Sequence, residues 1–507
     1  MHHLRVPVRA GALLAVACFL VSASPASAGL DEVDTQTLRK AVTVNGILGH
    51  ERALQSIANL NGGTRASGTP GYDASAAYVK RKLQAAGYKV TEQEFEFPFF
   101  EETAPAVFER TSPTPRPYVN PDDFVTMEYS GSGDTTAAVQ AVDVQVPPPG
   151  EPGSTSGCEA ADFAGFTAGN IALIQRGTCE FGVKAANAEA AGASAVIIFN
   201  EGQPGRQETL NGTLGGPAAT IPVIGTSFAV GEELVGLPAA QVHIKTMTLS
   251  ETRRTTNVLA DSEGGDAAQT VVVGAHLDSV PEGPGINDNG SGTATDLEVA
   301  VQLAKLDVTP RRKLRFAFWG AEESGLLGSQ HYVDNLGDEV SSIYANLNFD
   351  MVGSPNYVRF VYDGDGSATP AAGPPGSAQI EALFNDYFAG RGLATDPTAF
   401  DGRSDYGPFI ATGVPAGGLF TGAEGVKTPE QAAVYGGTAG IAFDPCYHQA
   451  CDTINNLNVN ALNEMGDAAA HATLVLAKSK SGLYPDGSRK AARDKSKAKK
   501  FDSEGAR

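Results

Sequence analysis

The chain has 507 residues, too many for one ordinary domain, and its 42% hydrophobic content is normal for a soluble globular protein. Its formal net charge of −21 repels nucleic acid and anionic membranes, so we expect neither as a partner. We therefore expect two domains, with terminal segments that belong to neither of them.

The first residues have the pattern of a secretory signal peptide. Arg5 and Arg9 supply the positive region, Gly11–Val21 the apolar run, and Ala26–Ala28 a small-residue cleavage site. We therefore predict that residues 1–28 are a signal peptide and that the protein is secreted and extracellular.

A lipoprotein alternative would use Cys18, but Ala15 stands where a large aliphatic residue is expected. No later apolar stretch is long enough to cross a membrane. At the other end, residues 486–507 are rich in Lys and Arg and predict a basic, disordered tail.

The segment 29–123 is expected to form the first part of a large domain. Apolar residues recur at helical spacing over Val42–Asn61 and Tyr72–Ala86, with a Gly-rich turn between them. Tyr88–Phe100 then predicts a strand, which ends in a Pro-rich excursion through Pro121.

Short strands and turns dominate residues 124–249. Ile171–Ile174 and Ala195–Phe199 predict buried strands, with a short helix over Val183–Ala191 between them. The segment has no cluster of His and carboxylates that could bind a metal. We expect an inserted, β-rich α+β domain with a binding or scaffolding role.

Strand, loop and helix alternate over residues 250–485, which predicts an α/β fold: a mixed, mostly parallel sheet flanked by helices. The expected strands are Thr270–Ala275, Lys313–Trp319 and Tyr344–Asp350, and the expected helix is Thr293–Leu306.

Ionisable residues follow each of these three strands. The first strand leads into His276, the second into Glu322 and Glu323, and the third into Asp350. Functional residues of open α/β sheets gather beyond the carboxyl ends of strands, so we expect these side chains to meet.

His276 and Asp278 are two residues apart in an extended segment and so share a face. This suits a metal-binding imidazole whose other ring nitrogen is held by a carboxylate, although alone the pair would be read as a surface His–Asp pair. Asp288, in the sharp loop before the helix, could bridge two cations; alone, such a loop is usually only a helix cap.

Glu322 and Glu323 are adjacent and must point in different directions, so one can bind a metal while the other acts as a general base. A solvated acidic turn is the alternative. Asp350 ends an apolar strand, where a buried carboxylate needs a cation or hydrogen-bond donors.

Four cysteines remain once the signal peptide is removed. In an exported chain they indicate two disulfides, and their spacing favours Cys158–Cys179 and Cys446–Cys451. A Cys-rich zinc site is the alternative, but no CxxC spacing is present. The second disulfide would stiffen the peptide that presents His448.

The loop Asp363–Ser377 contains Asp363-Gly-Asp365-Gly, which could bind calcium. It lacks the rest of an EF-hand loop, so a plain turn is the simpler interpretation.

Two His and several carboxylates suit paired zinc ions rather than a thiolate site. The order and content of five segments closely resemble metallopeptidase family 28, the secreted bacterial di-zinc aminopeptidases. The resemblance covers Ile47 to about Leu476, interrupted by the insert. The five segments are Gly274–Ser279, Gly285–Gly292, Phe318–Glu323, Asn348–Met351 and Cys446–His448.

This resemblance implies a zinc-exopeptidase fold and assigns the ligands of two zinc ions. The first zinc would be held by His276 and Asp350, the second by Glu323 and His448, with Asp288 bridging them.

Glu322 would be the general base, and Tyr447 would stabilise the oxyanion. The insert resembles a protease-associated domain in Asp162-Phe163 and Gly192-Ala193, with Cys158–Cys179 as its staple.

The implied function is a secreted, monomeric zinc aminopeptidase that acts on peptide or protein N-termini. It would prefer large hydrophobic first residues such as Leu, with a pocket formed partly by Val414–Phe420. A carboxypeptidase of the same superfamily is one alternative, for which Arg403 is the only obvious cationic partner of a substrate carboxylate. A one-zinc glutaminyl cyclase and a catalytically inactive binding protein are the others; the complete metal set favours an active enzyme.

Overall fold

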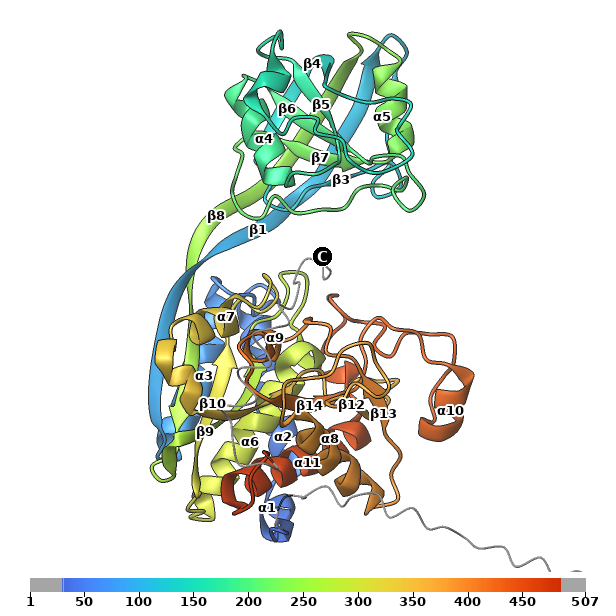
Figure 1. Cartoon of the computed structure of the whole chain (residues 1–507). Helices are drawn as coiled ribbons and strands as arrows, with labels where there is room; N and C mark the ends of the chain where they lie inside the picture. The colour runs from blue at the N-terminus through green and yellow to red at the C-terminus, as the bar shows by residue number, and fades with distance from the viewer. Residues whose placement is uncertain (1–29, 31, 485–507) are drawn as a thin grey trace, which may run out of the picture.

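The computed structural model describes residues 30 and 32–484, so the predicted signal peptide and basic tail lie outside the described residues. Figure 1 shows two parts joined by a long two-stranded ribbon, which consists of β1 (Lys89–Ser112) and β8 (Gln241–Asp261). Within the described ranges, none of the helices combines the length and the apolar character that crossing a membrane requires.

The larger part contains a mixed sheet with the strand order β13-β12-β14-β11-β9-β10-β8, and β1 pairs with β8. β9 pairs in parallel with β10 and β11, and β11 with β14, whereas β8 and β1 run antiparallel to their neighbours. The predicted mixed, mostly parallel sheet is confirmed. Its other strands are β9 (Asp266–His276), β10 (Arg312–Trp319), β11 (Ile343–Phe349), β12 (Phe360–Tyr362), β13 (Asp396–Thr398) and β14 (Ala416–Phe420).

Helices flank this sheet, and side-chain caps fix where two of the first ones begin. Thr43 Oγ1 accepts a hydrogen bond from the Gly46 amide, and Thr69 caps a helix that starts with Pro70. The helices are α1 (Gln36–Ala41), α2 (Val44–Leu60), α3 (Pro70–Ala85), α6 (Ser291–Lys305), α7 (Leu327–Asp334), α8 (Ser377–Ala389), α9 (Gly407–Ala411), α10 (Pro429–Tyr435) and α11 (Val459–Lys478).

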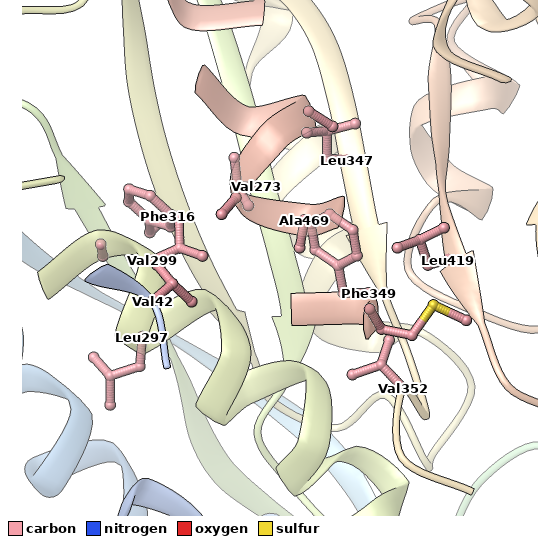
Figure 2. Packing of buried hydrophobic residues seen from close by; sticks show 14 of the residues in the cluster. Val42, Val273, Leu297, Val299, Phe316, Leu347, Phe349, Val352, Leu419 and Ala469 are labelled. Atoms are coloured by element: carbon pink, nitrogen blue, oxygen red, sulfur yellow. The ribbon is translucent and has the colours of Figure 1, made fainter. Parts of the chain in front are cut away.

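The main core lies between the sheet and the helices. Val273, Phe316 and Leu347 come from three adjacent strands and are fully buried. They belong to one cluster with Leu297 of α6 and Ala469 of α11 (Figure 2). Because β9, β10 and β11 are covered by protein on both faces, their sequences read as nearly continuous apolar runs.

The inserted part has its own sheet, β4-β5-β6-β7-β3, whose β4 pairs with the far half of β8. It also has its own cores, and the disulfide Cys158–Cys179 lies within it. The elements are β2 (Arg116–Pro117), β3 (Phe124–Thr126), β4 (Gly133–Val142), β5 (Ile171–Gln175), α4 (Phe181–Ala190), β6 (Ala195–Phe199), β7 (Val223–Thr226) and α5 (Phe228–Val235).

The expectation that the first strand ends at Phe100 is wrong, because β1 continues to Ser112. It pairs with β8 along its whole length, and a register shift between Ala104 and Val107 accommodates Pro105. Phe108, in the far half of β1, packs into a core of the inserted part. The ribbon therefore belongs to both parts, and we place the end of the larger part within β1 and β8.

We predict that the larger part folds without the inserted part when residues 100–250 are replaced by an Asn-Gly turn. Phe99 and Glu251 are direct partners in the β1–β8 ladder, so a two-residue turn can join them. Circular dichroism and thermal unfolding should show a cooperative transition.

The matched control deletes only residues 124–249. This control should aggregate, because the deletion removes the core that covers Phe108. In the intact protein Phe108 is 2% exposed. The reverse behaviour of the two variants would contradict this division of the chain.

Candidate metal centre

The carboxyl ends of three adjacent strands place the predicted residues together. β9 ends at His276, Glu322 and Glu323 follow β10, and Asp350 follows β11. Ala321 and Met351, which adjoin two of these carboxylates, have left-handed φ values of 53° and 50°. Non-glycine residues rarely adopt this conformation, and it concentrates at functional sites. Here it turns the chain sharply at the ends of the strands.

The first group of potential ligands is deeply buried. His276 Nε2 lies 3.2 Å from Asp288 Oδ1 and 3.3 Å from Asp350 Oδ1, and the imidazole is 1% exposed. Ser404 Oγ donates a 2.5 Å hydrogen bond to the other oxygen of Asp350. This bond orients Asp350 so that its Oδ1 faces the imidazole.

The second group shares Asp288 with the first. His448 Nε2 lies 3.2 Å from Asp288 Oδ2 and 3.0 Å from Glu323 Oε2. Asp288 therefore turns one carboxylate oxygen toward each imidazole. This is the geometry that a ligand bridging two cations requires.

His448 comes from a loop closed by the disulfide Cys446–Cys451. Its backbone φ is 55°, and its ring stacks on that of Tyr447 at a centroid distance of 3.9 Å. The His448 side chain is 40% exposed, whereas that of His276 is 1% exposed. The second group therefore forms the solvent-facing side of the site.

The residues fit a pair of divalent cations. Glu323 Oε1 and Asp350 Oδ1 are buried and accept no hydrogen bond from any described residue. A buried carboxylate oxygen without a donor is unfavourable unless a cation lies beside it. Imidazole and carboxylate together are the ligand set of a borderline cation such as zinc.

The two groups of potential ligands line one cavity, and Glu322 lines it too. A carboxylate oxygen of Glu322 lies 3.9 Å from His276 Nε2. Burial raises the pKa of Glu322 well above its ordinary value; the nearby His276 opposes this shift and the Asp405 carboxylate adds to it. A shift in this direction is the one that burial produces in carboxyl groups used for general acid–base catalysis.

Asp278 contacts both the His276 segment and the Glu322 segment, although its carboxylate is not the nearest partner of the imidazole. The nearest partner of His276 Nδ1 is the backbone carbonyl of Asp278, at 3.1 Å, and the carboxylate lies at 3.7 Å. The carboxylate accepts a 3.3 Å hydrogen bond from the Glu322 amide. Asp278 thus links the His276 segment to the Glu322 segment.

Tyr447 and Arg403 also line the cavity. Arg403 Nη1 donates a 2.8 Å hydrogen bond to Glu424, and Nη2 donates a 3.4 Å bond to the Tyr447 hydroxyl. Within the part of the chain that the structure describes, Arg403 is the only Lys or Arg that lines this cavity. Its charge is already paired with that of Glu424.

Sequence reasoning missed the residues that hold the Asp288 turn, the kinked segment η2 (Ile286–Gly290), in which Asp288 and Asn289 have non-helical backbone angles. Asp452 accepts hydrogen bonds from the backbone amides of Asn287 and Asp288 at 2.9 and 3.0 Å. Asp444 accepts a 2.6 Å bond from the Asn287 side chain. The only available signal was that Asp444 and Asp452 flank the second disulfide in the sequence.

The apolar wall of the cavity differs from the stretch expected from the sequence. Of Val414–Phe420, only Phe420 lines the cavity, because the rest packs within β14 and the core beside it. Met351, Tyr362 and Ala423 supply other apolar surface.

The Asp363 loop has the contacts of a turn. The Asp363 carboxylate accepts hydrogen bonds from the backbone amides of residues 366–369, at distances from 2.6 to 3.2 Å. Asp365 and Glu381 lie close enough to form a three-carboxylate cluster with it. The donors already satisfy Asp363, so the loop needs no cation to hold its shape.

Comparison with known proteins bears on both parts of the molecule. The model of peptidase family M28 matches residues 257–473, and that of the PA domain matches residues 139–234. An aminopeptidase from Pseudomonas aeruginosa is 50% identical over 439 residues, which cover 86% of this chain and 81% of that protein.

Two further similarities agree with this. Leucine aminopeptidase 2 from Trichophyton equinum is 47% identical over 333 residues, or 65% of this chain and 66% of that protein. The solved structure of a zinc aminopeptidase from Bacillus subtilis superposes with a TM-score of 0.59 at 26% identity, covering 87% of this chain and 97% of that chain. The protein therefore belongs to peptidase family M28, a family of hydrolases, and its inserted part contains a PA domain.

Proposed function

We propose that the protein is a two-zinc aminopeptidase that removes N-terminal residues from peptides. One observation carries this proposal: Asp288 lies between His276 and His448 at 3.2 Å from each, in a cavity that Glu322 also lines. The arrangement offers two cation sites with a shared carboxylate and a separate group for proton transfer.

The contacts support two zinc ions. His276 and Asp350 would hold the first, Glu323 and His448 the second, and Asp288 would bridge them. The name of the Bacillus subtilis structure includes zinc, which agrees with this ligand set. We propose no calcium ion at Asp363, since backbone amides satisfy its carboxylate.

Zinc held by these residues would supply Lewis-acid polarisation of the scissile carbonyl. Glu322 then takes a proton from the attacking water and delivers it to the leaving amine. The Tyr447 hydroxyl, on the cavity wall, donates a hydrogen bond to the developing oxyanion.

Charge selects the end of the peptide that enters. Glu322 and Asp401 line the cavity and are not among the proposed zinc ligands, so their carboxylates favour an α-ammonium group over an α-carboxylate. A carboxypeptidase would need a free cation for the substrate carboxylate, but Arg403 is paired with Glu424. The aminopeptidase function is therefore better supported than its carboxypeptidase alternative.

We further propose a preference for large apolar first residues such as Leu. Met351, Tyr362 and Phe420 line the cavity, and an apolar side chain gains free energy by leaving water to contact them. The name of the Trichophyton equinum relative agrees with this preference.

We propose that the enzyme is secreted and acts as a monomer on peptide or protein N-termini. Two disulfides support an oxidising compartment, since such bonds persist outside the cytosol. The inserted part contributes none of the proposed ligands, so we assign it a role in substrate access rather than in catalysis.

Glu322→Gln should keep both metals and the fold but lose about 10²–10⁴-fold in kcat, the usual contribution of a general base. Glu323→Gln should weaken zinc binding instead, because Glu323 Oε2 faces His448. Steady-state kinetics and metal analysis on both variants check the assignment. If Glu322→Gln lost metal while Glu323→Gln kept it, the two roles would be reversed.

Metal analysis of the wild-type protein should return two zinc ions per chain. His448→Ala should lower this number and the rate together, because its imidazole is a proposed ligand of the second zinc. His243→Ala is the matched control, since this His pairs with Glu109 and Asp134 on the inserted part. One zinc per wild-type chain at full activity would rule out the bridged pair.

Leucine p-nitroanilide should be cleaved, and its N-acetylated form should not, because acetylation removes the cation that the acidic cavity binds. The aspartate p-nitroanilide should be cleaved more slowly than the leucine one. Release of p-nitroaniline, followed by absorbance, compares the substrates. Rapid cleavage of the acetylated compound would instead support an enzyme that does not read the N-terminus.

A further inference from the structure

A fully buried arginine lies behind the proposed metal centre. Arg65 belongs to the turn between α2 and α3 and is 0% exposed. Its guanidinium donates hydrogen bonds to the backbone carbonyls of Leu277, Pro284 at 2.8 Å and Gly285 at 2.6 Å. Because the side chain is fully buried, it has no surface that a substrate could contact.

These carbonyls lie at the two ends of the segment that connects His276 to Asp288. Leu277 directly follows His276, and Gly285 directly precedes the turn that contains Asp288. The backbone of Gly285 has a φ of 57°, and a Cβ atom there would lie 2.2 Å from the Asp288 carbonyl oxygen. The guanidinium thus joins both ends of this segment through one rigid, planar group.

Residues next to Arg65 in the sequence also hydrogen-bond to the segment between His276 and Asp288. Thr64 Oγ1 donates a 2.9 Å hydrogen bond to the Val280 carbonyl, and the Arg65 amide donates a 3.0 Å bond to Ser279 Oγ. Ser67 Oγ accepts a 2.7 Å bond from the amide of Ala321, the residue before Glu322. Segment 64–67 therefore contacts the connection between two proposed ligands and also the residue that precedes the proposed base.

We propose that Arg65 is a positioning residue that sets the separation of His276 and Asp288 by holding the carbonyls of Leu277 and Gly285 in one fork of hydrogen bonds. This inference rests on the proposed two-zinc function and names a residue outside the matched range 257–473 of the family. Arg65 acts through the backbone and touches neither substrate nor metal.

Lysine cannot replace this fork. Its ammonium group keeps the positive charge but presents it at one point, so it cannot reach the carbonyls on both sides of the segment in fixed geometry. Arg65→Lys therefore separates the charge of the side chain from its shape. Arg65→Met removes both while keeping an unbranched apolar stem.

The chain offers a matched control in Arg312, which is 3% exposed. Its guanidinium also donates to backbone carbonyls, those of Leu476, Ser479 and Ser481, at 2.8, 2.7 and 3.2 Å. Arg312 begins β10, whereas the proposed metal centre follows the end of that strand. Arg312→Lys should cost stability without changing the metal centre.

The experiment measures zinc affinity by competition with a chelator, the visible spectrum of the cobalt-substituted protein, kcat and KM, and thermal stability. Arg65→Lys and Arg65→Met should both bind zinc about 10–100-fold more weakly, the usual effect of removing a group that orients ligands. Both should show a changed cobalt spectrum and a lower kcat. Arg312→Lys should keep the wild-type zinc affinity, spectrum and kcat.

Wild-type zinc affinity and cobalt spectrum in Arg65→Lys would overturn the proposal, since charge alone would then suffice. An equal loss of zinc in Arg312→Lys would also overturn it, because the effect would be one of general stability. If the Arg65 variants do not fold, Ser279→Ala is measured in their place, because it removes both the acceptor of the Arg65 amide and the hydroxyl that donates to the Gly283 carbonyl at 2.9 Å, and so loosens the segment that the guanidinium also holds. An unchanged zinc affinity in this variant would overturn the proposal, since the hold on this segment would then not affect zinc binding. Failure of the proposed function is distinct, since it would show in the wild-type protein as missing zinc or missing activity.

Discussion

The structure depends on keeping one carboxylate, Asp288, between two imidazoles. Its two oxygens each lie 3.2 Å from a His Nε2, with Glu323 and Asp350 close by. Negative charges gathered in a buried site repel one another and lose their hydration. Cations must compensate for this cost, and the surrounding fold must prevent the carboxylates from moving apart.

Hydrogen bonds from distant segments hold the Asp288 turn. Asp452 accepts from the amides of the turn, and Arg65 donates to carbonyls of the segment that leads into it. These residues come from opposite ends of the chain, so the shape of the turn depends on contacts between segments far apart in the sequence. Backbone donors and acceptors also restrict the turn without adding a side chain to the cavity.

The two-part architecture separates the chemistry from the inserted sheet. None of the described groups that could hold a metal includes a residue of the inserted part. The ribbon of β1 and β8 nevertheless enters both sheets, as Figure 1 shows. A continuous antiparallel ladder bends and twists less freely than a single-stranded linker would. The ribbon therefore restrains where the inserted part lies relative to the larger one.

The sequence by itself determined the α/β class, the strands that lead into His276, Glu322 and Asp350, and the pairing of the four cysteines that the structure contains. These features follow from local patterns: apolar runs, turn residues and spacing. It did not determine the length of β1, whose prolines read as a strand end, since a partner strand and a bulge accommodate them. It also missed Ser404, Asp452 and Arg65, because their importance lies in contacts between segments far apart in the chain. Only the tertiary structure decides such contacts, since hydrogen-bond partners are set by where the packed core brings the backbone together.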